Sequence, residues 1–300
     1  MTAVKKGNHM RILVPSSSAN LGPGFDCFGI AWQSRNEIFF DHSDTLSIEG
    51  CAVEYANSVN LAWLGYSKAM ELAGKKCEGV HIRFGRTEIP ICRGLGSSAA
   101  LSVAGAAAAD ALFGLGLGRQ GILDAATAVE GHPDNVAPAI YGGLTASMMD
   151  GTRAVTVNFP IHEKLRFTAL IPDFQLSTAM ARSVLPKQVD RADAIFNVSR
   201  GALLLNALGS GDLELLGLAM DDKLHQPYRW GLIPGSAEAR AAAKDCGAAA
   251  LCISGAGPTI LCVTEDESFT PRIREALADT LPTWEVRELK IDRQGVQVES

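Results

Sequence analysis

The sequence predicts an α+β protein built from two halves, and three observations lead to this prediction. Its 300 residues exceed one domain of ordinary size. Hydrophobic residues make up 47% of the chain and charged residues 20%, which is typical of a globular protein with a full core. Strand-like and helix-like stretches alternate irregularly, whereas a parallel α/β sheet requires regular alternation. We place the boundary near Pro160, which gives an N-terminal half at residues 10–160 and a C-terminal half at residues 161–300.

The first half is expected to hold most of the strands. Residues 11–15 (RILVP) are typical of a buried strand, and residues 16–29 are so rich in turn-forming residues that they indicate a loop. Apolar and β-branched residues predict further strands at residues 36–41, 45–49, 80–84, 144–149 and 154–159. Helical spacing predicts helices at residues 59–73, from the serines at 97–98 onward, at 122–129 and, in a shorter form, after Pro133.

The second half is expected to add a smaller set of strands and longer helices. A strand is predicted at residues 167–172, followed by one helical stretch at residues 190–220 and a helix at residues 236–244. The next predicted elements are two strands at residues 251–253 and 260–263 joined by the glycine turn SGAGPT, a helix at 271–281 and a strand at 284–291.

Charge and cysteine usage exclude several classes of protein. The net charge of −6 argues against general binding to nucleic acid or to an anionic membrane. The seven cysteines are scattered and form no C-x-x-C pair, which suits a reducing cytoplasm and indicates neither a disulfide framework nor a zinc site. The first nine residues carry two lysines without a following apolar segment, so we expect no signal peptide or anchor there. The sequence does not decide between a monomer and a homodimer.

The segment IPICRGLGSSAALSVAGAAAADALFG, residues 89–114, indicates an anion site at the start of a helix. Gly94 and Gly96 allow the backbone to approach a ligand closely, and Ser97 or Ser98 is expected to cap the helix. The free N–H groups of a first helical turn bind phosphate. Several hydrogen bonds to a charged group, each worth roughly 1.5–3 kcal/mol, outweigh the helix dipole. The alternative is a tightly packed helix start without a ligand.

Two familiar nucleotide-binding loops fit this segment poorly. A P-loop requires a lysine that is missing after Gly96. The dinucleotide fingerprint matches Gly94, Gly96 and Ala99, but a second helix follows where that fingerprint requires a strand. The third interpretation is a kinase loop of another fold, which requires metal ligands and a second substrate site. A dinucleotide-binding oxidoreductase and a non-catalytic nucleotide-binding protein stay as alternatives.

Three segments resemble, in order and spacing, the motifs of the GHMP small-molecule kinases: PSSSANLGPGFDCFG, GLGSSAA and SGAGPT. ANLGPGFDCFG, EGHPDNVAPAIYGG, ARSVLP and DDKLHQPYR further resemble segments of homoserine kinases. The resemblance implies a two-domain architecture, with a first half like ribosomal protein S5 domain 2 and a ferredoxin-like second half. It also implies ATP-dependent phosphorylation of the L-homoserine hydroxyl to O-phospho-L-homoserine, a step of threonine biosynthesis. Another GHMP-type small-molecule kinase is the alternative.

The resemblance implies ATP and Mg²⁺ as cofactors. Mg²⁺ prefers one or two protein oxygens together with phosphates, and the resemblance places Ser98 and Glu130 on the metal. A plain helix cap and a solvated helix end are the alternatives for these two residues. Asn60 resembles a contributor to the adenine pocket, with an ordinary N-cap as the alternative. The expected nucleotide-binding loop consists of Pro90, Ile91, Cys92, Arg93, Gly94, Leu95, Gly96, Ser97, Ser98, Ala99 and Ala100.

An amino-acid acceptor presents an ammonium group and a carboxylate, and its site needs both opposite charges. Asp26 is the candidate for the ammonium group, and Asn20 for the ammonium group or the hydroxyl. By the resemblance, Arg182 and Arg229 match the positions that hold the substrate carboxylate. The guanidinium fork suits this role because it binds a carboxylate in bidentate fashion. Both arginines lie in the second half, so the acceptor is expected between the halves.

Phosphoryl transfer depends mostly on positioning and charge neutralisation. By the resemblance to homoserine kinases, Asn135 orients the acceptor hydroxyl, and Asp134 is a less favoured base. His132 is a candidate substrate contact, with a structural loop histidine as the alternative. The catalytic candidates are thus Asn135, Asn20 and Arg182, and whether a general base operates stays open.

Overall fold

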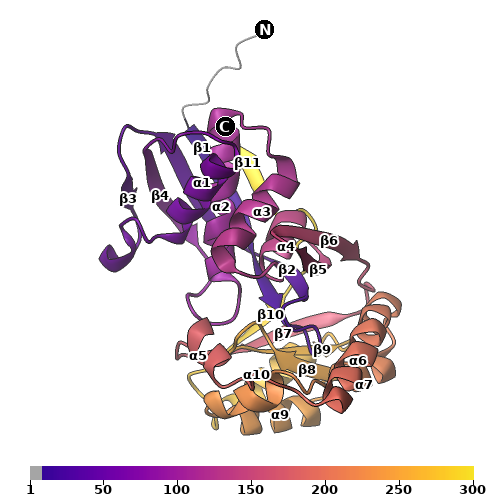
Figure 1. Cartoon of the computed structure of the whole chain (residues 1–300). Coiled ribbons are helices and arrows are strands. Elements are labelled where there is room, and N and C mark those ends of the chain that lie inside the picture. The colour runs from indigo at the N-terminus through magenta and orange to yellow at the C-terminus, as the bar shows by residue number, and fades with distance from the viewer. Residues whose placement is uncertain (1–8) are drawn as a thin grey trace.

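The chain folds into two lobes stacked along one long axis (Figure 1). The computed structural model describes residues 9–300, so residues 1–8, considered above for a signal peptide or anchor, lie outside the described residues. Within the described range the strands form a seven-stranded sheet in the first lobe and a four-stranded sheet in the second. Helices pack on both sheets. This arrangement confirms the α+β prediction.

The larger sheet forms the framework of the first lobe. Its strands are β1 (His9–Ala19), β2 (Phe28–His42), β3 (Ser47–Glu49), β4 (Val80–Thr87), β5 (Leu144–Asp150), β6 (Arg153–Phe159) and β11 (Gln297–Glu299). The order is β11-β1-β2-β4-β3, and β5 pairs with β2 and β6. Strand β11 was not predicted, and it brings the C-terminal residues back beside β1.

The loop predicted at residues 16–29 is wrong at both of its ends. Residues 16–19 continue β1 after a register shift at Pro15, and β2 already begins at Phe28. Serines are tolerated there because their hydroxyls find buried partners; the indole Nε1 of Trp32, for example, donates to Ser18 Oγ at 2.8 Å. Pairing with a distant strand therefore overrides the local turn propensity of these residues.

Four α-helices pack on this sheet, and two of them approach each other unusually closely. They are α1 (Leu61–Leu72), α2 (Ser97–Phe113), α3 (Gly118–Glu130) and α4 (Val136–Tyr141), preceded by the short helix η1 (Val53–Tyr55). A Cβ on Gly65 of α1 would lie 2.1 Å from Ser102 O, and one on Gly105 of α2 would lie 1.8 Å from Ala62 O. Small residues are thus required where α1 and α2 cross, which accounts for the alanine-rich sequence of α2.

The second lobe contains the smaller sheet, in the order β10-β7-β9-β8. Its strands are β7 (Arg166–Ile171), β8 (Ala250–Ile253), β9 (Ile260–Thr264) and β10 (Glu285–Leu289). Its helices are α5 (Thr178–Ser183), α6 (Arg191–Ser210), α7 (Leu213–Ala219), α8 (Gln226–Arg229), η2 (Trp230–Leu232), α9 (Ser236–Asp245) and α10 (Phe269–Leu277). Helices α9 and α10 cover the face of this sheet that is turned away from the first lobe (Figure 1).

The single helical stretch predicted at residues 190–220 is wrong, because it is broken into α6 and α7. Gly211 adopts a left-handed conformation with φ 75° and ends α6. Asp212 then caps α7 by accepting a hydrogen bond from Leu215 N at 3.0 Å. Helices α5 and α8 were not predicted, since a segment of four to six residues is too short for a periodic pattern to show.

One hydrophobic cluster spans both lobes, and two smaller clusters lie within the second lobe. The rings of Trp32 on β2 and Phe167 on β7 lie 5.1 Å apart, and Arg35 pairs with the buried Asp292 just before the return to β11. Dividing the chain at residues 160 and 161 stays a prediction, and it does not account for β11, because this strand lies in the first sheet.

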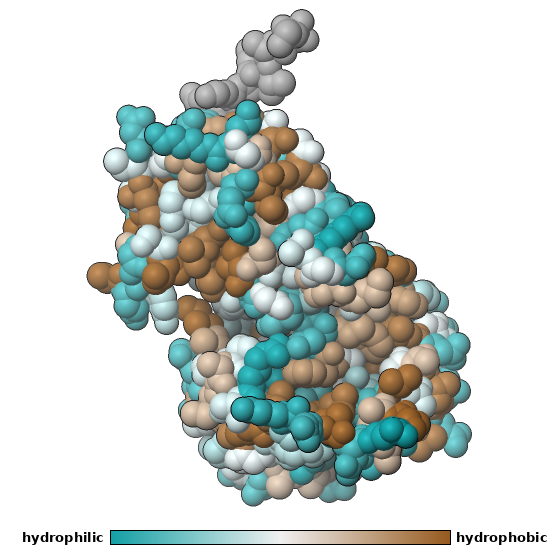
Figure 2. Space-filling view, in the orientation of Figure 1, coloured by the Kyte–Doolittle hydropathy of each residue, from teal (hydrophilic) through white to brown (hydrophobic). Residues whose placement is uncertain are grey.

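Hydrophilic and hydrophobic residues are interspersed over the face drawn in Figure 2, and the outline of the molecule narrows where the lobes meet. Nowhere in residues 9–300 is a helix both long enough and apolar enough to cross a membrane.

Candidate active site

A cavity of about 460 Å³ lies where the two lobes meet. The first lobe contributes the end of η1, the start of α1, the beginning of α2 and the loop before α2, residues 90–96, which we call the glycine loop. The second lobe contributes segments around Ser177 and Ala256. The lining residues are Tyr55, Val59, Asn60, Leu61, Ile91, Cys92, Arg93, Gly94, Gly96, Ser97, Ser98, Ala99, Leu101, Glu130, His132, Asn135, Leu176, Ser177, Thr178, Gly255, Ala256 and Gly257. Most of the expected nucleotide loop is therefore in the wall.

The glycine loop requires its glycines. Gly94 and Gly96 adopt φ 75° and 73°, a left-handed conformation that favours glycine. A Cβ on Gly94 would lie 2.3 Å from Ser254 O, and one on Gly96 would lie 2.2 Å from Ser17 Oγ. At both positions the loop lies so close to neighbouring atoms that a residue with a Cβ would clash.

The prediction that Ser97 or Ser98 caps helix α2 is wrong. The N-cap residue is Gly96, and no side chain caps the helix there. Both serines belong to the first helical turn, so neither occupies the capping position. The N–H groups at the start of α2 therefore have no capping side chain. The uncapped N–H groups of this turn are available to an anion in the cavity, which supports the expected phosphate site.

The turn at residues 254–259 supports the glycine loop from the second lobe. Ser254 Oγ lies 2.5 Å from Gly94 O and 2.6 Å from Ser18 Oγ. Thr259 Oγ1 donates to Arg93 O at 2.5 Å. The turn thus fixes the backbone of the loop across the lobe boundary.

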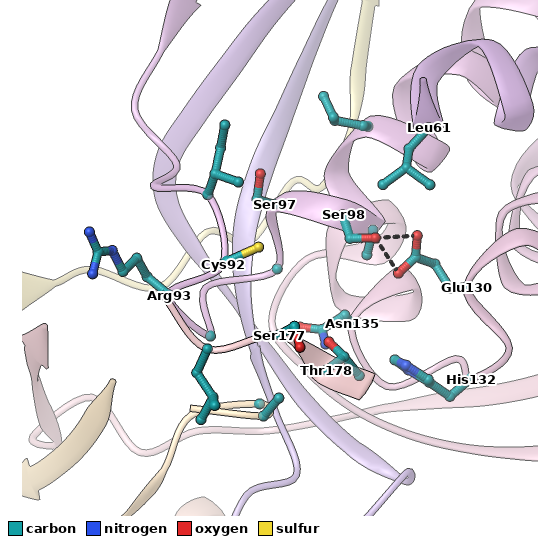
Figure 3. Close-up of a pocket in the computed structure, with 18 of the residues that line it drawn as sticks. Leu61, Cys92, Arg93, Ser97, Ser98, Glu130, His132, Asn135, Ser177 and Thr178 are labelled. Carbon is teal, nitrogen blue, oxygen red and sulfur yellow. Dashed lines mark hydrogen bonds between the residues drawn. The ribbon is translucent and has the colours of Figure 1, made fainter. Parts of the chain in front are cut away.

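Three of the loop residues predicted to bind nucleotide are not in the cavity wall. Pro90 lies outside the lining, and Leu95 and Ala100 point into the core, where both are buried. The carbonyl of Leu95 accepts a hydrogen bond from Ser17 N at 3.1 Å, which ties the loop to β1. Arg93 contacts the cavity, but its Nη1 donates to Pro172 O at 2.9 Å and its guanidinium points away from the other labelled side chains (Figure 3).

Two candidate metal ligands face each other in the cavity wall (Figure 3). Ser98 Oγ lies 2.7 and 2.8 Å from the two carboxylate oxygens of Glu130, the last residue of α3. Ser102 Oγ, one turn further along α2, donates to Glu130 Oε1 at 2.8 Å. The arrangement offers hard oxygen ligands, which are the donors that Mg²⁺ prefers.

Asn60 shapes the end of the cavity next to α1. Its Oδ1 accepts from Ala62 N at 2.9 Å, which caps α1, and its Nδ2 donates to Tyr55 O at 2.8 Å. The side chain therefore joins η1 to α1, and both residues next to the cap, Val59 and Leu61, line the cavity. An adenine-binding role for Asn60 stays a prediction.

His132 and Asn135 line the other end of the cavity, and Asp134 lies beneath them, fully buried. The imidazole Nδ1 of His132 donates to Asp134 Oδ1 at 2.6 Å. Burial opposes protonation of His132, but the hydrogen bond and the charge of Asp134 outweigh it and raise the pKa of His132. Asn135 Oδ1 accepts from Ser17 Oγ at 2.9 Å, so the protein itself holds the oxygen end of this amide.

Asn20 and Asp26 are placed beside this group by strained backbone. Both residues adopt left-handed conformations, with φ 56° and 53°, and Asn20 Oδ1 accepts from Asp26 N at 2.8 Å. Ligating atoms of Asp26, His132 and Asp134 lie within 4.8 Å of one another. The loop after β1 thus brings the Asp26 carboxylate next to His132, while Asn20 and Asp26 themselves do not line the cavity.

The two expected arginines meet at the same place. Arg182 on α5 donates from Nη1 and Nη2 to Asp26 at 3.0 and 2.5 Å. Arg229 is fully buried and donates to Ala181 O and Gly255 O, both at 3.2 Å. Burial and the charge of Arg182 lower the pKa of Arg229 to about 10. Substrate binding by these residues stays a prediction.

Sequence reasoning missed the residues that hold Arg229 in place. The ring of Phe25 lies 5.3 Å from the guanidinium carbon of Arg182 and 5.1 Å from that of Arg229. His225 Nδ1 accepts from Arg229 Nη1 at 3.3 Å and its ring stacks on Phe25, and Asp222 accepts from His225 N at 2.9 Å. The spacing of Asp222 and His225, typical of a helix cap, was the signal that could have identified them.

Comparisons with known proteins agree with this geometry. Residues 60–143 match the family model of the GHMP kinases N terminal domain, and residues 204–283 match that of the GHMP kinases C terminal domain. A homoserine kinase of Clostridium botulinum (strain Okra / Type B1) is 44% identical over 292 residues, which cover 96% of this chain and 98% of the relative. One from the Alaska E43 strain is 38% identical over 289 residues, 95% and 97% of the two chains.

Solved structures show the same similarity. The crystal structure of homoserine kinase from Cytophaga hutchinsonii superimposes with a TM-score of 0.87 at 27% identity, over 100% of both chains. The L. major mevalonate kinase in complex with R-mevalonate has a TM-score of 0.71 at 14% identity, over 94% of this chain and 95% of that one, and this similarity concerns the fold.

Proposed function

The chain belongs to the GHMP kinase family, and we propose that it transfers the γ-phosphoryl group of ATP to the side-chain hydroxyl of L-homoserine. The two-domain architecture expected from the motifs is confirmed by this membership. The product, O-phospho-L-homoserine, would serve threonine biosynthesis. One observation carries the proposal. A single cavity is lined both by the glycine loop and by His132, and Asp26 and Arg182 lie beside His132 with the two charges that complement an amino acid.

The triphosphate is assigned to the glycine loop and the open start of α2. The N–H groups of the first turn and of the loop backbone can each donate to a phosphate oxygen. In the described residues α2 is followed directly by α3, so the strand–helix–strand unit of a dinucleotide-binding oxidoreductase does not form around this loop. This argues against that alternative.

Ser98 and Glu130 are assigned to Mg²⁺. They fit the ion because a hydroxyl and a carboxylate, both oxygen donors, lie side by side in the wall next to the phosphate site. When bound, the ion would neutralise charge on the phosphates of ATP. Ser102 holds the Glu130 carboxylate in orientation from behind.

The acceptor is assigned to the group around Asp26. The Asp26 carboxylate suits the ammonium group, with Asn20 beside it, and Arg182 with Arg229 suits the carboxylate. His132 and Asn135 then lie at the reacting end of the cavity. Ser17 holds the oxygen of the Asn135 amide, so we assign to Asn135 a donor role toward the acceptor hydroxyl or the phosphoryl group. Asp134 is fully buried and bonded to His132, so we assign it no direct proton transfer.

We place this reaction in a reducing cytoplasm, because the seven cysteines are free thiols. An assay of ADP release with MgATP and a panel of acceptors tests the function: homoserine, serine, threonine, mevalonate and galactose. Homoserine is expected to give the highest kcat/KM. Preference for mevalonate or galactose, which lack an amino-acid head group, would reject the assignment of the two arginines and Asp26.

A further inference from the structure

We propose that Asp26 and Arg182 form an internal ion pair that the acceptor must replace, and that this exchange selects acceptors carrying both an ammonium group and a carboxylate. The inference rests on the proposed function and deepens it. Without substrate, the two groups assigned to opposite charges of the acceptor neutralise each other. A zwitterion inserted between them satisfies both at once.

The pair joins the lobes at the acceptor site. Asp26 belongs to the loop after β1, and Arg182 belongs to α5 in the second lobe. Arg182 Nη1 donates to Asp26 Oδ2 at 3.0 Å and Nη2 donates to Oδ1 at 2.5 Å, in the bidentate geometry that Arg also uses for a carboxylate ligand. The side chains are 37% and 35% exposed, so a small ligand can reach the pair.

Surrounding charges make each partner dependent on an opposite charge. The guanidinium groups of Arg182 and Arg229 both face the ring of Phe25, and their repulsion adds to burial in lowering the pKa of Arg229. Asp26 offsets this repulsion. On the other side, the Asp26 carboxylate lies near the buried carboxylate of Asp134, which is bonded to His132.

A ligand with one charge cannot restore this balance. A carboxylate alone would pair with Arg182 but leave Asp26 without its cation beside Asp134. An amine alone would pair with Asp26 but leave Arg182 beside Arg229 without its anion. Leaving a partly buried charge uncompensated costs more than a new pair returns, so the internal pair weakens the binding of such ligands.

Two homoserine analogues test the exchange by equilibrium binding. 4-Hydroxybutanoate lacks the amino group, and 3-aminopropan-1-ol lacks the carboxylate. We expect Asp26→Asn to bind 4-hydroxybutanoate about fivefold more tightly than the wild type, because Arg182 is then free, and Arg182→Gln to bind the amine more tightly by a similar factor. Both variants should bind homoserine more weakly. Unchanged or weaker binding of the matching analogue in both variants would overturn the proposal.

A control pair separates this effect from a general change of charge. Lys164 and Glu265 form an ion pair of similar exposure at 2.9 Å in the second lobe, and neither lines the cavity. Lys164→Gln and Glu265→Gln should leave all three dissociation constants unchanged. A gain in analogue binding in these variants would remove the argument for a specific exchange.

Crystal structures of the wild type test the same point without any substitution. Crystals without acceptor should show Asp26 bonded to Arg182, and crystals with homoserine and an ATP analogue should show the ligand between them with the pair broken. An intact pair in a complex of an enzyme that turns over homoserine would overturn the exchange and leave the function standing. Absence of homoserine turnover in the ADP-release assay, with another acceptor preferred, would instead reject the function.

Discussion

Asp134 lies directly beneath His132, with 2.6 Å between its Oδ1 and the imidazole Nδ1, and its carboxylate is fully buried. The other carboxylate oxygen of Asp134 has no hydrogen-bond partner among the described residues. A buried carboxylate with one bonded oxygen favours the protonated form of the adjacent imidazole, because that form compensates its charge. The pair therefore favours a positive charge on His132, the histidine that lines the cavity within residues 9–300.

This relationship predicts a pH-dependent contribution to stability. The folded-state pKa of His132 lies above its ordinary value of 6.5, so the contribution is complete below pH 6.5 and is lost as pH rises through the folded pKa. Urea unfolding of the wild type and of His132→Gln across this range should show a difference that shrinks with rising pH. The wild type must be compared with the variant because burial lowers the pKa of His225. The contribution of His225 to stability therefore changes with pH in the opposite direction. A difference that grows with pH would contradict the assignment.

Arg182→Ala should raise the KM for homoserine far more than the KM for ATP. One charged hydrogen bond contributes roughly 1.5–3 kcal/mol, which corresponds to a rise of about 10- to 100-fold. Steady-state kinetics with each substrate varied in turn measures the two constants. Arg166→Ala is a suitable control, since Arg166 pairs with Glu267 on the surface. Equal effects of Arg182→Ala on both KM values would contradict a carboxylate-binding role.

Glu130→Gln should lower kcat at saturating ATP and homoserine by about 100-fold, because a neutral amide is a weaker magnesium ligand and positions charge less well. The concentration of Mg²⁺ that gives half-maximal rate should rise in parallel. Kinetics over a series of Mg²⁺ concentrations measures both effects. Ser102→Ala removes a partner of Glu130 without touching the cavity wall, so its effect should be much smaller. Normal turnover of Glu130→Gln at every Mg²⁺ concentration would exclude Glu130 from the metal site.

Gly96→Ala should abolish ATP binding and destabilise the fold. The left-handed φ costs an L-residue about 1–2 kcal/mol, and the new Cβ would also overlap Ser17 Oγ at 2.2 Å. Gly116→Ala is a matched control, because Gly116 has φ 72° with nothing within 4 Å of the added Cβ. Urea unfolding should show the backbone cost alone for Gly116→Ala and a larger loss for Gly96→Ala. Equal losses would show that the close approach at Gly96 is unimportant.

Helices and strands with a long, regular pattern could be predicted from the sequence, because their signals are local. The cores of α1, α2, α9 and β7 follow from apolar spacing and from glycines at helix ends. The short helices α5 and α8 could not be predicted, because segments of six and four residues are too short for a periodic pattern to show.

The sequence by itself determined that a loop with two glycines precedes an alanine-rich helix, and that charged residues suited to a zwitterion occur in both halves. Only the tertiary structure decided that Gly96 and not a serine begins α2, that β11 returns to the first sheet, and that Asp26 pairs with Arg182. The physical reason is range. Backbone preference acts over a few residues, whereas Asp26 and Arg182, 156 positions apart, meet only because the shared core holds the two lobes together.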